Sequence, residues 1–275
     1  MDPVARDRRR ALLLAVPALA VFAAFWLLPM VRLAQVGGSG KEGVAAYFAV
    51  VTNPQYFRSL VSTVSLSAGV TVVTLVLSLI AGIFLQRNRF PGRGVLISLM
   101  TLPLAFPGVV VGFMVILLVG RQGLVGDVTS QLFGEKLVFA YGMGGLFVGY
   151  LYFSIPRVIL TIMASVEKLD PALEEAARSL GASTWQVTRD VMLPALGPAI
   201  VSSGAICFAT SMGAFGTAFT LATQINVLPL TIYNEFTNYA NFAMAASLSI
   251  VLGLITWAAL AAARSLAGAG VAAAG

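Results

Sequence analysis

Few residues in this 275-residue chain are of types that do chemistry at their side chains. The absence of histidine rules out serine–histidine and cysteine–histidine nucleophiles, histidine zinc sites and histidine proton relays. The single cysteine, Cys207, cannot form an internal disulfide, and a lone cysteine in an apolar run is usually a small filler. Gly40-Lys41 is followed by Glu42 rather than Ser or Thr, so it is not a phosphate-binding loop. We therefore expect no catalytic residue, no metal site and no nucleotide site in this chain.

One charged segment between long apolar runs has a composition suited to recognition by another protein. It reads Glu174-Glu175-Ala176-Ala177-Arg178-Ser179-Leu180-Gly181, and Met192-Leu193-Pro194 follows after a short interval. The two carboxylates could meet basic or polar groups of a partner, and the two alanines allow close approach. A chain this apolar would not be expected to keep such a segment unless something outside the membrane held it.

The same segment carries the start and stop signals of two short helices. Asp170-Pro171 is a strong helix start, since Asp caps free N–H groups and Pro is tolerated at the first helical position. Gly181 is a natural C-terminal stop, and Ser183 with Gln186 fits a capping box. Residues 170–193 are therefore predicted to form helix, sharp turn and helix beside the membrane.

The amino-acid composition predicts the kind of helices that flank this segment and hold it in position. Hydrophobic residues make up 59% and charged residues 10%, against about 25% charged in a typical soluble domain. We considered a soluble protein with buried helices and rejected it, because so little polar surface remains. The apolar residues gather into six runs near the length that spans a bilayer, which predicts an all-α membrane protein: Ala11–Val31, Leu60–Leu85, Val95–Val119, Leu137–Pro156, Ala195–Phe215 and Tyr239–Ala263.

The basic residues predict the orientation. Twelve of the 17 Lys and Arg residues fall on one side of the predicted spans, and the positive-inside rule assigns that side, with both termini, to the cytoplasm. The first run is longer than a usual signal-peptide core and lacks a small-residue cleavage site, so we expect it to be retained. The net charge of +6 is then explained by this bias and by anionic lipid rather than nucleic acid. The twelve residues are Arg6, Arg8, Arg9, Arg10, Arg87, Arg89, Arg93, Arg157, Lys168, Arg178, Arg189 and Arg264.

The full charged segment resembles the cytoplasmic loop of the membrane subunits of type I ABC importers, the binding-protein-dependent permeases. The match comprises Asp-Pro, Glu-Glu-Ala-Ala, a glycine five residues after the first alanine, and a Leu-Pro whose proline lies thirteen residues beyond that glycine. The six runs and Phe57-Arg58-Ser59-Leu60 with Ser62-Thr63 are also similar to the family's layout. The resemblance implies one transmembrane permease domain over 1–275, with a core over about 56–264, in the bacterial cytoplasmic membrane.

The resemblance also implies the roles of the segment and its partners. The loop between spans four and five would be the coupling helix, with Glu174, Glu175, Ala176, Ala177 and Gly181 on the family motif. The partners would be two copies of an ABC ATPase holding ATP and Mg, a second and distinct permease, and a periplasmic or lipid-anchored solute-binding protein. This chain would move solute by alternating access and would not itself be an enzyme.

Helix-weakening residues predict where the solute passes. Pro103, Pro107 and Gly108 interrupt span three, and residues 213–216 end span five. Irregular backbone at membrane depth is tolerated where it lines a cavity. Gly108-xxx-Gly112 and Gly145-xxx-Gly149 would permit close approach of helices where the membrane subunits slide. The expected path passes Phe106, Pro107, Ser211, Phe215, Thr217, Thr220, Tyr233 and Glu235.

The sequence does not determine the solute, and it leaves two other protein classes to consider, a secondary transporter or channel subunit and a membrane enzyme. The most similar branch is that of permeases for polyamines, iron, sulfate and phosphonates, and Glu235, the sole acid of the last outer segment, ranks a polyamine or related small charged solute first. A secondary transporter or channel subunit without an ATPase would need an ion site, yet the predicted spans contain no acid. The same spans offer no catalytic constellation for a membrane enzyme.

Overall fold

Helices make up every regular element of the described chain. The computed structural model describes residues 14–221 and 225–273, with side chains as far as residue 265, and these residues contain no strand. Six helical runs are long and apolar enough to cross a bilayer, which confirms the all-α class. Arg6, Arg8, Arg9, Arg10 and residues 11–13 of the predicted first span lie outside the described residues. The six runs are Leu14–Gly38, Pro54–Arg87, Gly108–Phe133, Met143–Glu167, Thr184–Met212 and Phe242–Ser265.

The chain divides into two compact units. The first unit combines Met1–Phe57 with Thr231–Leu252, and the second combines Arg58–Leu230 with Gly253–Gly275. Helices α4, α13 and α14 each contribute residues to both units. The expectation of a single domain over 1–275 stays a prediction.

The first unit joins the N-terminal helix to the start of the last one. Ser247 Oγ donates a 3.0 Å hydrogen bond to the carbonyl of Gly37, and the Tyr47 hydroxyl donates to the carbonyl of Ala34. A Cβ on Gly37 would lie 2.7 Å from the Tyr47 hydroxyl, so only glycine permits this contact. The elements are η1 (Ala23–Leu27), α2 (Leu28–Gly38), η2 (Gly43–Phe48), α3 (Ala49–Thr52), most of α13 (Leu228–Thr237) and the first part of α14 (Phe242–Ala273).

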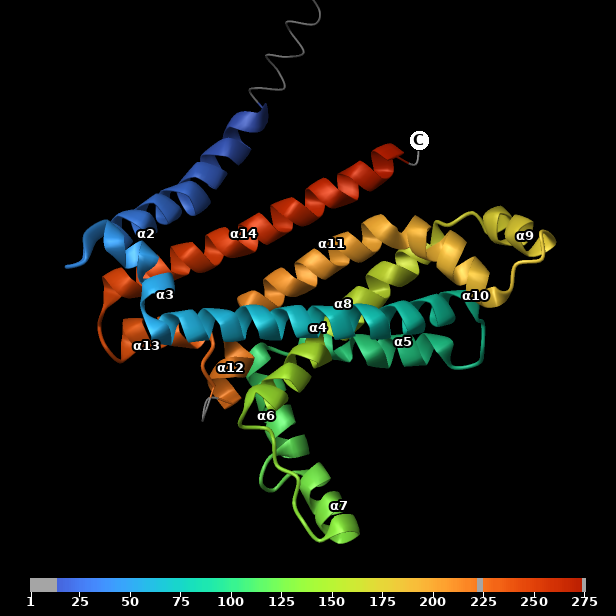
Figure 1. Ribbon diagram of the computed structural model, residues 1–275, viewed down its shortest axis with the longest axis horizontal. Helices are drawn as coiled ribbons and strands as arrows, with labels where there is room; N and C mark the ends of the chain where they lie inside the picture. Colours follow the sequence, from blue (N-terminus) through green and yellow to red (C-terminus); the bar gives the residue numbers. More distant parts are fainter. Residues whose placement is uncertain (1–13, 222–224, 274–275) are drawn as a thin grey trace, which may run out of the picture. The chain divides into compact units, whose positions relative to one another are not determined.

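The second unit holds most of the membrane-spanning helices and the charged segment (Figure 1). Helices α10, η4 and α11 follow one another without a loop and form one run, Thr184–Met212. The elements are α4 (Pro54–Arg87), α5 (Arg93–Thr101), η3 (Leu102–Ala105), α6 (Gly108–Val119), α7 (Leu124–Phe133), α8 (Met143–Glu167), α9 (Pro171–Ser179), α10 (Thr184–Gln186), η4 (Val187–Met192), α11 (Leu193–Met212) and α12 (Gly216–Leu221).

The predicted third span, Val95–Val119, is wrong as a continuous helix. The chain forms α5 and η3, becomes extended at Phe106 and Pro107, and changes direction into α6 (Figure 1). Pro103 and Pro107 each lack the N–H that a helix needs, and the residue before a proline avoids the α region. The apolar run that continues from Gly108 extends instead through α7 to Phe133.

The fourth span is displaced toward the C-terminus relative to the prediction Leu137–Pro156. Helix α8 begins at Met143 and continues through Pro156 to Glu167. Residues 158–166 contain no Gly or Pro, so no helix-breaking residue ends this helix before Glu167. Proline inside a membrane helix is tolerated where neighbouring side chains satisfy the freed carbonyl.

Glycines allow α12 to pack closely against both α6 and α8. A Cβ on Gly112 would lie 2.6 Å from Thr220 Cβ, and one on Gly149 would lie 2.8 Å from Thr217 Cγ2. Gly108 and Gly112 thus allow close packing between α6 and α12 of the same chain. Gly145 differs, because its added Cβ would meet the carbonyl of Ala140 rather than another helix.

Gly112→Ala should lower the thermal stability of the purified protein, because overpacking in a close-packed core typically costs about 1–3 kcal/mol. Gly197→Ala is the matched control, since an added Cβ there meets nothing within 4 Å. Alanine in that helix should leave stability unchanged or slightly higher. Melting of the two variants in detergent tests the packing, and equal melting temperatures would contradict it.

Candidate functional site

The charged segment folds as two capped helices joined by a sharp turn. Asp170 Oδ1 accepts a 2.9 Å hydrogen bond from the backbone N–H of Ala172 at the start of α9. Gly181 adopts a φ of +88°, which L side chains rarely adopt. Ser183 and Gln186 form the predicted capping box, with bonds of 2.8 and 3.4 Å. The predicted helix–turn–helix is confirmed; we call residues 170–192 the bracket.

An ion pair attaches the bracket to the membrane helices. Arg87 at the end of α4 donates to the carboxylate of Glu174 on α9. Glu175 and Ala176 are exposed, and Ala177 is half-buried. Of the two predicted docking carboxylates, Glu174 therefore has a partner within the chain, and Glu175 is available to another protein.

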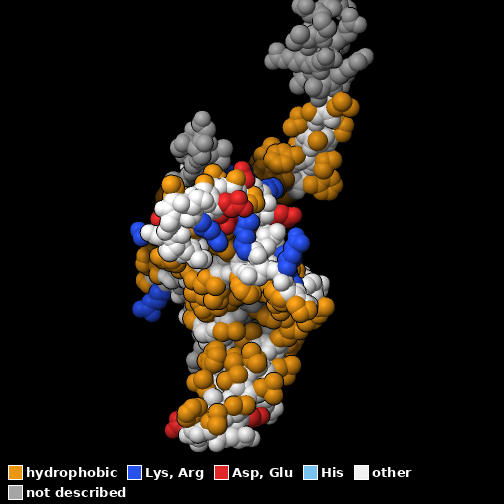
Figure 2. Space-filling model, turned by 90° about the vertical axis from the view of Figure 1, so that its right-hand side faces the viewer, with side chains coloured by type: hydrophobic (Ala, Val, Ile, Leu, Met, Phe, Trp, Pro, Cys, Tyr) orange, Lys and Arg blue, Asp and Glu red, His pale blue; other side chains and the backbone are white. Residues whose placement is uncertain are grey.

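Three large apolar side chains stand exposed on the bracket. Leu180 is 90% exposed, Trp185 68% and Leu173 55%, and we call them the apolar patch. Val187, by contrast, is buried. Basic and acidic side chains gather on the same end of the unit, as Figure 2 shows. An apolar patch rimmed by charges is typical of a protein interface.

A cavity of about 290 Å³ lies where the chain breaks between η3 and α6. Arg157 lines it from α8, one turn after Phe153, and Thr210 lines it from α11. It is lined by residues of η3, α6, α8, α11 and α12 and of the segments between them, namely Pro103, Leu104, Phe106, Gly108, Val111, Phe153, Arg157, Thr210, Ala214, Gly216 and Thr217.

Side-chain hydroxyls satisfy the backbone at this break. Thr217 Oγ1 donates to the carbonyl of Gly108 at 2.9 Å, and Thr220 Oγ1 donates to that of Gly216 at 3.0 Å. The Tyr150 hydroxyl donates to the carbonyl of Ala214 at 2.5 Å. Because a backbone group without a partner is costly in hydrocarbon, these bonds stabilise the irregular segments.

The predicted path residues separate into two groups. Phe106 and Thr217 line the cavity; Pro107 directly precedes α6 and Phe215 directly precedes α12, and Thr220 donates to the carbonyl of Val109 at 3.3 Å. Ser211 is buried, and its hydroxyl has no partner among the described residues. Tyr233 and Glu235 belong to the first unit, in α13.

Glu235 is buried, and its carboxylate is hydrogen-bonded to other residues of the chain. It is 6% exposed, and Oε1 accepts a 2.8 Å hydrogen bond from the Tyr56 hydroxyl. Its Oε2 accepts a bond from the Asn241 amide at 3.2 Å. Both carboxylate oxygens are therefore engaged within the chain.

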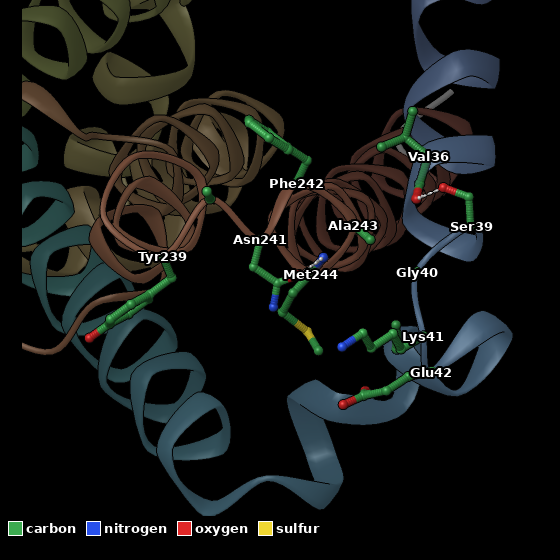
Figure 3. Close-up of a pocket in the computed structure, with 12 residues that line it drawn as sticks. Val36, Ser39, Gly40, Lys41, Glu42, Tyr239, Asn241, Phe242, Ala243 and Met244 are labelled. Carbon is green, nitrogen blue, oxygen red and sulfur yellow. Dashed lines mark hydrogen bonds between the residues drawn. The ribbon is translucent and has the colours of Figure 1, made fainter.

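A hollow of about 630 Å³ lies in the first unit between the end of α2 and the start of α14. Figure 3 shows Lys41 and Glu42 on one side of it, with Tyr239, Asn241 and Met244 on the other. Its mixture of charged, polar and apolar residues is suited to contact with another protein.

Sequence reasoning missed Arg157 and Thr210 as site residues. Arg157 was assigned to the loop after span four, because Pro156 was taken as the end of that span. The uninterrupted run 158–166 was the signal that the helix continues past it. Among the described residues, no group of three or more His, Cys, Asp and Glu could hold a metal ion.

Comparison with known proteins identifies a family over most of the chain. Residues 74–268 match the model of the family described as binding-protein-dependent transport system inner membrane component. The chain is 34% identical over 212 residues to the sulfate transport system permease protein CysT of Escherichia coli (strain K12), covering 76% of each. It is 32% identical over 210 residues to the molybdenum transport system permease protein ModB of the same strain, covering 74% of this chain and 89% of that protein.

Solved structures show the same fold. A chain of the bacterial alginate ABC transporter, in complex with an alginate pentasaccharide-bound periplasmic protein, superposes with a TM-score of 0.82 at 19% identity. The match covers 95% of this chain and 96% of that one. A chain of the MetNI methionine ABC transporter, in an inward-facing conformation, gives 0.61 at 16% identity over 78% and 95% of the two chains.

The Arg87–Glu174 ion pair should hold α9 against the end of α4. Because both side chains are partly exposed, a double-mutant cycle of Arg87→Ala and Glu174→Ala should give a coupling energy of about 0.2–1 kcal/mol. Amide exchange in α9 should rise in either single variant and rise no further in the double variant. Strictly additive effects on both readouts would show that the pair does not attach the bracket.

Proposed function

This chain belongs to the binding-protein-dependent transport system inner membrane component family, and we propose that it moves a small oxyanion through the membrane. It is a multi-pass permease subunit of an ABC importer. The proposal concerns the solute, the partners and the way in which the bracket drives transport.

The observation that supports the coupling role is the position of the bracket between two cavity-lining helices. The bracket follows α8 and continues directly into α11. It presents the apolar patch and Glu175 outward, while Glu174 ties it to α4. A partner that grips the patch can therefore pull on α8 and α11 together.

We place the bracket on the cytoplasmic side, as the distribution of basic residues predicts. Two ATPase subunits, which carry the ATP and Mg, grip the bracket of this chain and that of a second permease. Closure of the ATPases on ATP rocks the two permeases from an inward-facing to an outward-facing state. In this scheme, the chain transmits force and lines the path but does not hydrolyse ATP.

A solute-binding protein delivers the solute at the outer face. The hollow between Lys41, Glu42 and Asn241 is the surface of this chain that we assign to that contact. Lys41 and Glu42 precede α4, which is long and apolar enough to cross the membrane. A charged, partly apolar surface of this kind suits a transient docking partner.

The names of the relatives support the proposed class of solute. CysT and ModB are named for sulfate and molybdenum transport, and CysW of Synechocystis is also named for sulfate transport. The polyamine expectation depended on Glu235, whose oxygens are engaged by Tyr56 and Asn241. We therefore propose a tetrahedral oxyanion such as sulfate or molybdate in place of a polyamine.

Glu175→Lys should abolish solute uptake and solute-stimulated ATP hydrolysis, while membrane insertion is retained. The reversed charge would face the ATPase surface that the exposed carboxylate meets. Glu135→Lys is the matched control, because Glu135 is exposed on the loop after α7, far along the chain from the bracket. If Glu175→Lys transports as well as Glu135→Lys, the bracket does not couple the ATPase to transport.

Uptake by liposomes containing the whole transporter tests the solute. With the binding protein and ATP present, radiolabelled sulfate or molybdate should accumulate and spermidine should not. Omitting the ATPase subunits should stop uptake, whereas a secondary transporter would continue. Spermidine accumulation without oxyanion accumulation would overturn the proposed solute class.

A further inference from the structure

Arg157 lies inside one of the helices that are long and apolar enough to cross a bilayer. It is the fifteenth of 25 residues in α8. Ten residues separate it from Glu167, so it lies roughly 15 Å along the helix from that end.

Among the described residues, the guanidinium of Arg157 has no ion-pair or hydrogen-bond partner. Its side chain is exposed. None of the described residues that line its cavity carries a carboxylate. A charged group inside the membrane is costly, so an unpaired one is retained where it meets water or a charged ligand.

The other groups around the cavity also favour an anion. Thr210 also lines the cavity, and Phe106 and Gly108 place the N-terminal end of α6 there. Pro107 precedes this 12-residue helix and provides no side-chain cap. The positive end of the helix dipole is therefore directed to the same space as the guanidinium.

We propose that Arg157, Thr210 and the N-terminal end of α6 form a subsite for a tetrahedral oxyanion on its way through the membrane. This rests on the proposed function, because it names the residues of this chain that meet the solute. The guanidinium fork binds two oxygens of the anion. The Thr210 hydroxyl, which donates to the carbonyls of Ile206 and Cys207 at 2.9 and 3.0 Å, turns its proton to a third oxygen when the anion is present. A cavity of about 290 Å³ accommodates a small ion with some of its water.

A site with a single cation is suited to an anion that passes through the membrane, because it binds the anion without holding it tightly. An ion must bind well enough to leave the binding protein and weakly enough to be released. The arginine lies on α8, and the hydroxyl lies on α11, the two helices that flank the bracket. Movement of the bracket can therefore separate the two groups and release the anion.

The test uses the complete transporter in liposomes, with ³⁵S-sulfate and with molybdate as probes. Arg157→Gln should lower the transport rate at subsaturating binding protein at least about tenfold, the effect of losing a hydrogen bond to a charged group. Arg157→Lys should retain part of the rate, because it keeps the charge and loses the fork. Thr210→Val should show a smaller loss. Arg121→Gln, which removes an arginine outside the cavity, should transport like the wild type.

Three readouts separate the possible outcomes. ATP hydrolysis stimulated by the loaded binding protein should persist in Arg157→Gln, and the second permease should co-purify with it in normal amounts. Transport by Arg157→Gln equal to that of the wild type would overturn the subsite and leave the proposed function intact. Loss of the second permease from that variant would show that Arg157 serves assembly instead, which also overturns the subsite. If the wild type accumulates neither oxyanion, the proposed solute class fails first, and the subsite fails with it.

Discussion

A membrane helix can be interrupted only where its freed backbone groups find partners. The chain breaks at Phe106–Pro107 and again at residues 213–215, and both breaks border the same cavity. Thr217 and Tyr150 donate to carbonyls at the two breaks. Because Gly108, Gly112 and Gly149 let α12 approach α6 and α8, these hydroxyls come within bonding distance. The cavity beside Arg157 and the contacts of α12 therefore both depend on these hydrogen bonds at the two breaks.

Two of the helices that line the cavity, α8 and α11, are also those that flank the bracket. Helix α8 ends at Glu167, and the bracket follows within a few residues, whereas α10, η4 and α11 form one run to Met212. The Arg87–Glu174 pair adds the end of α4 to this arrangement. Continuous helix therefore joins the bracket to the cavity through α11, and Lys168 and Leu169 join it to α8.

The features predictable from the sequence are those with local physical signals. Asp170, Gly181 and the Ser183–Gln186 capping box act within one helical turn, and the structure shows each of them. The six spans followed from apolar length. The break at Phe106–Pro107 was foreseen as a weak point, but the predicted third span ran through it, since apolar periodicity does not show where a proline redirects the chain. Arg157 was missed because its role depends on α6, α11 and α12 coming together, which no local pattern encodes.

The central claim is that the bracket is the surface through which an ATP-hydrolysing partner moves the permease. Leu180, the most exposed of the three apolar-patch residues, gives the most direct test. A photoreactive p-benzoylphenylalanine placed at Leu180 in the intact transporter should cross-link to the ATPase subunit, and one placed at the exposed Phe133 of α7 should not. Equal labelling of the ATPase from both positions, or none from Leu180, would contradict the account.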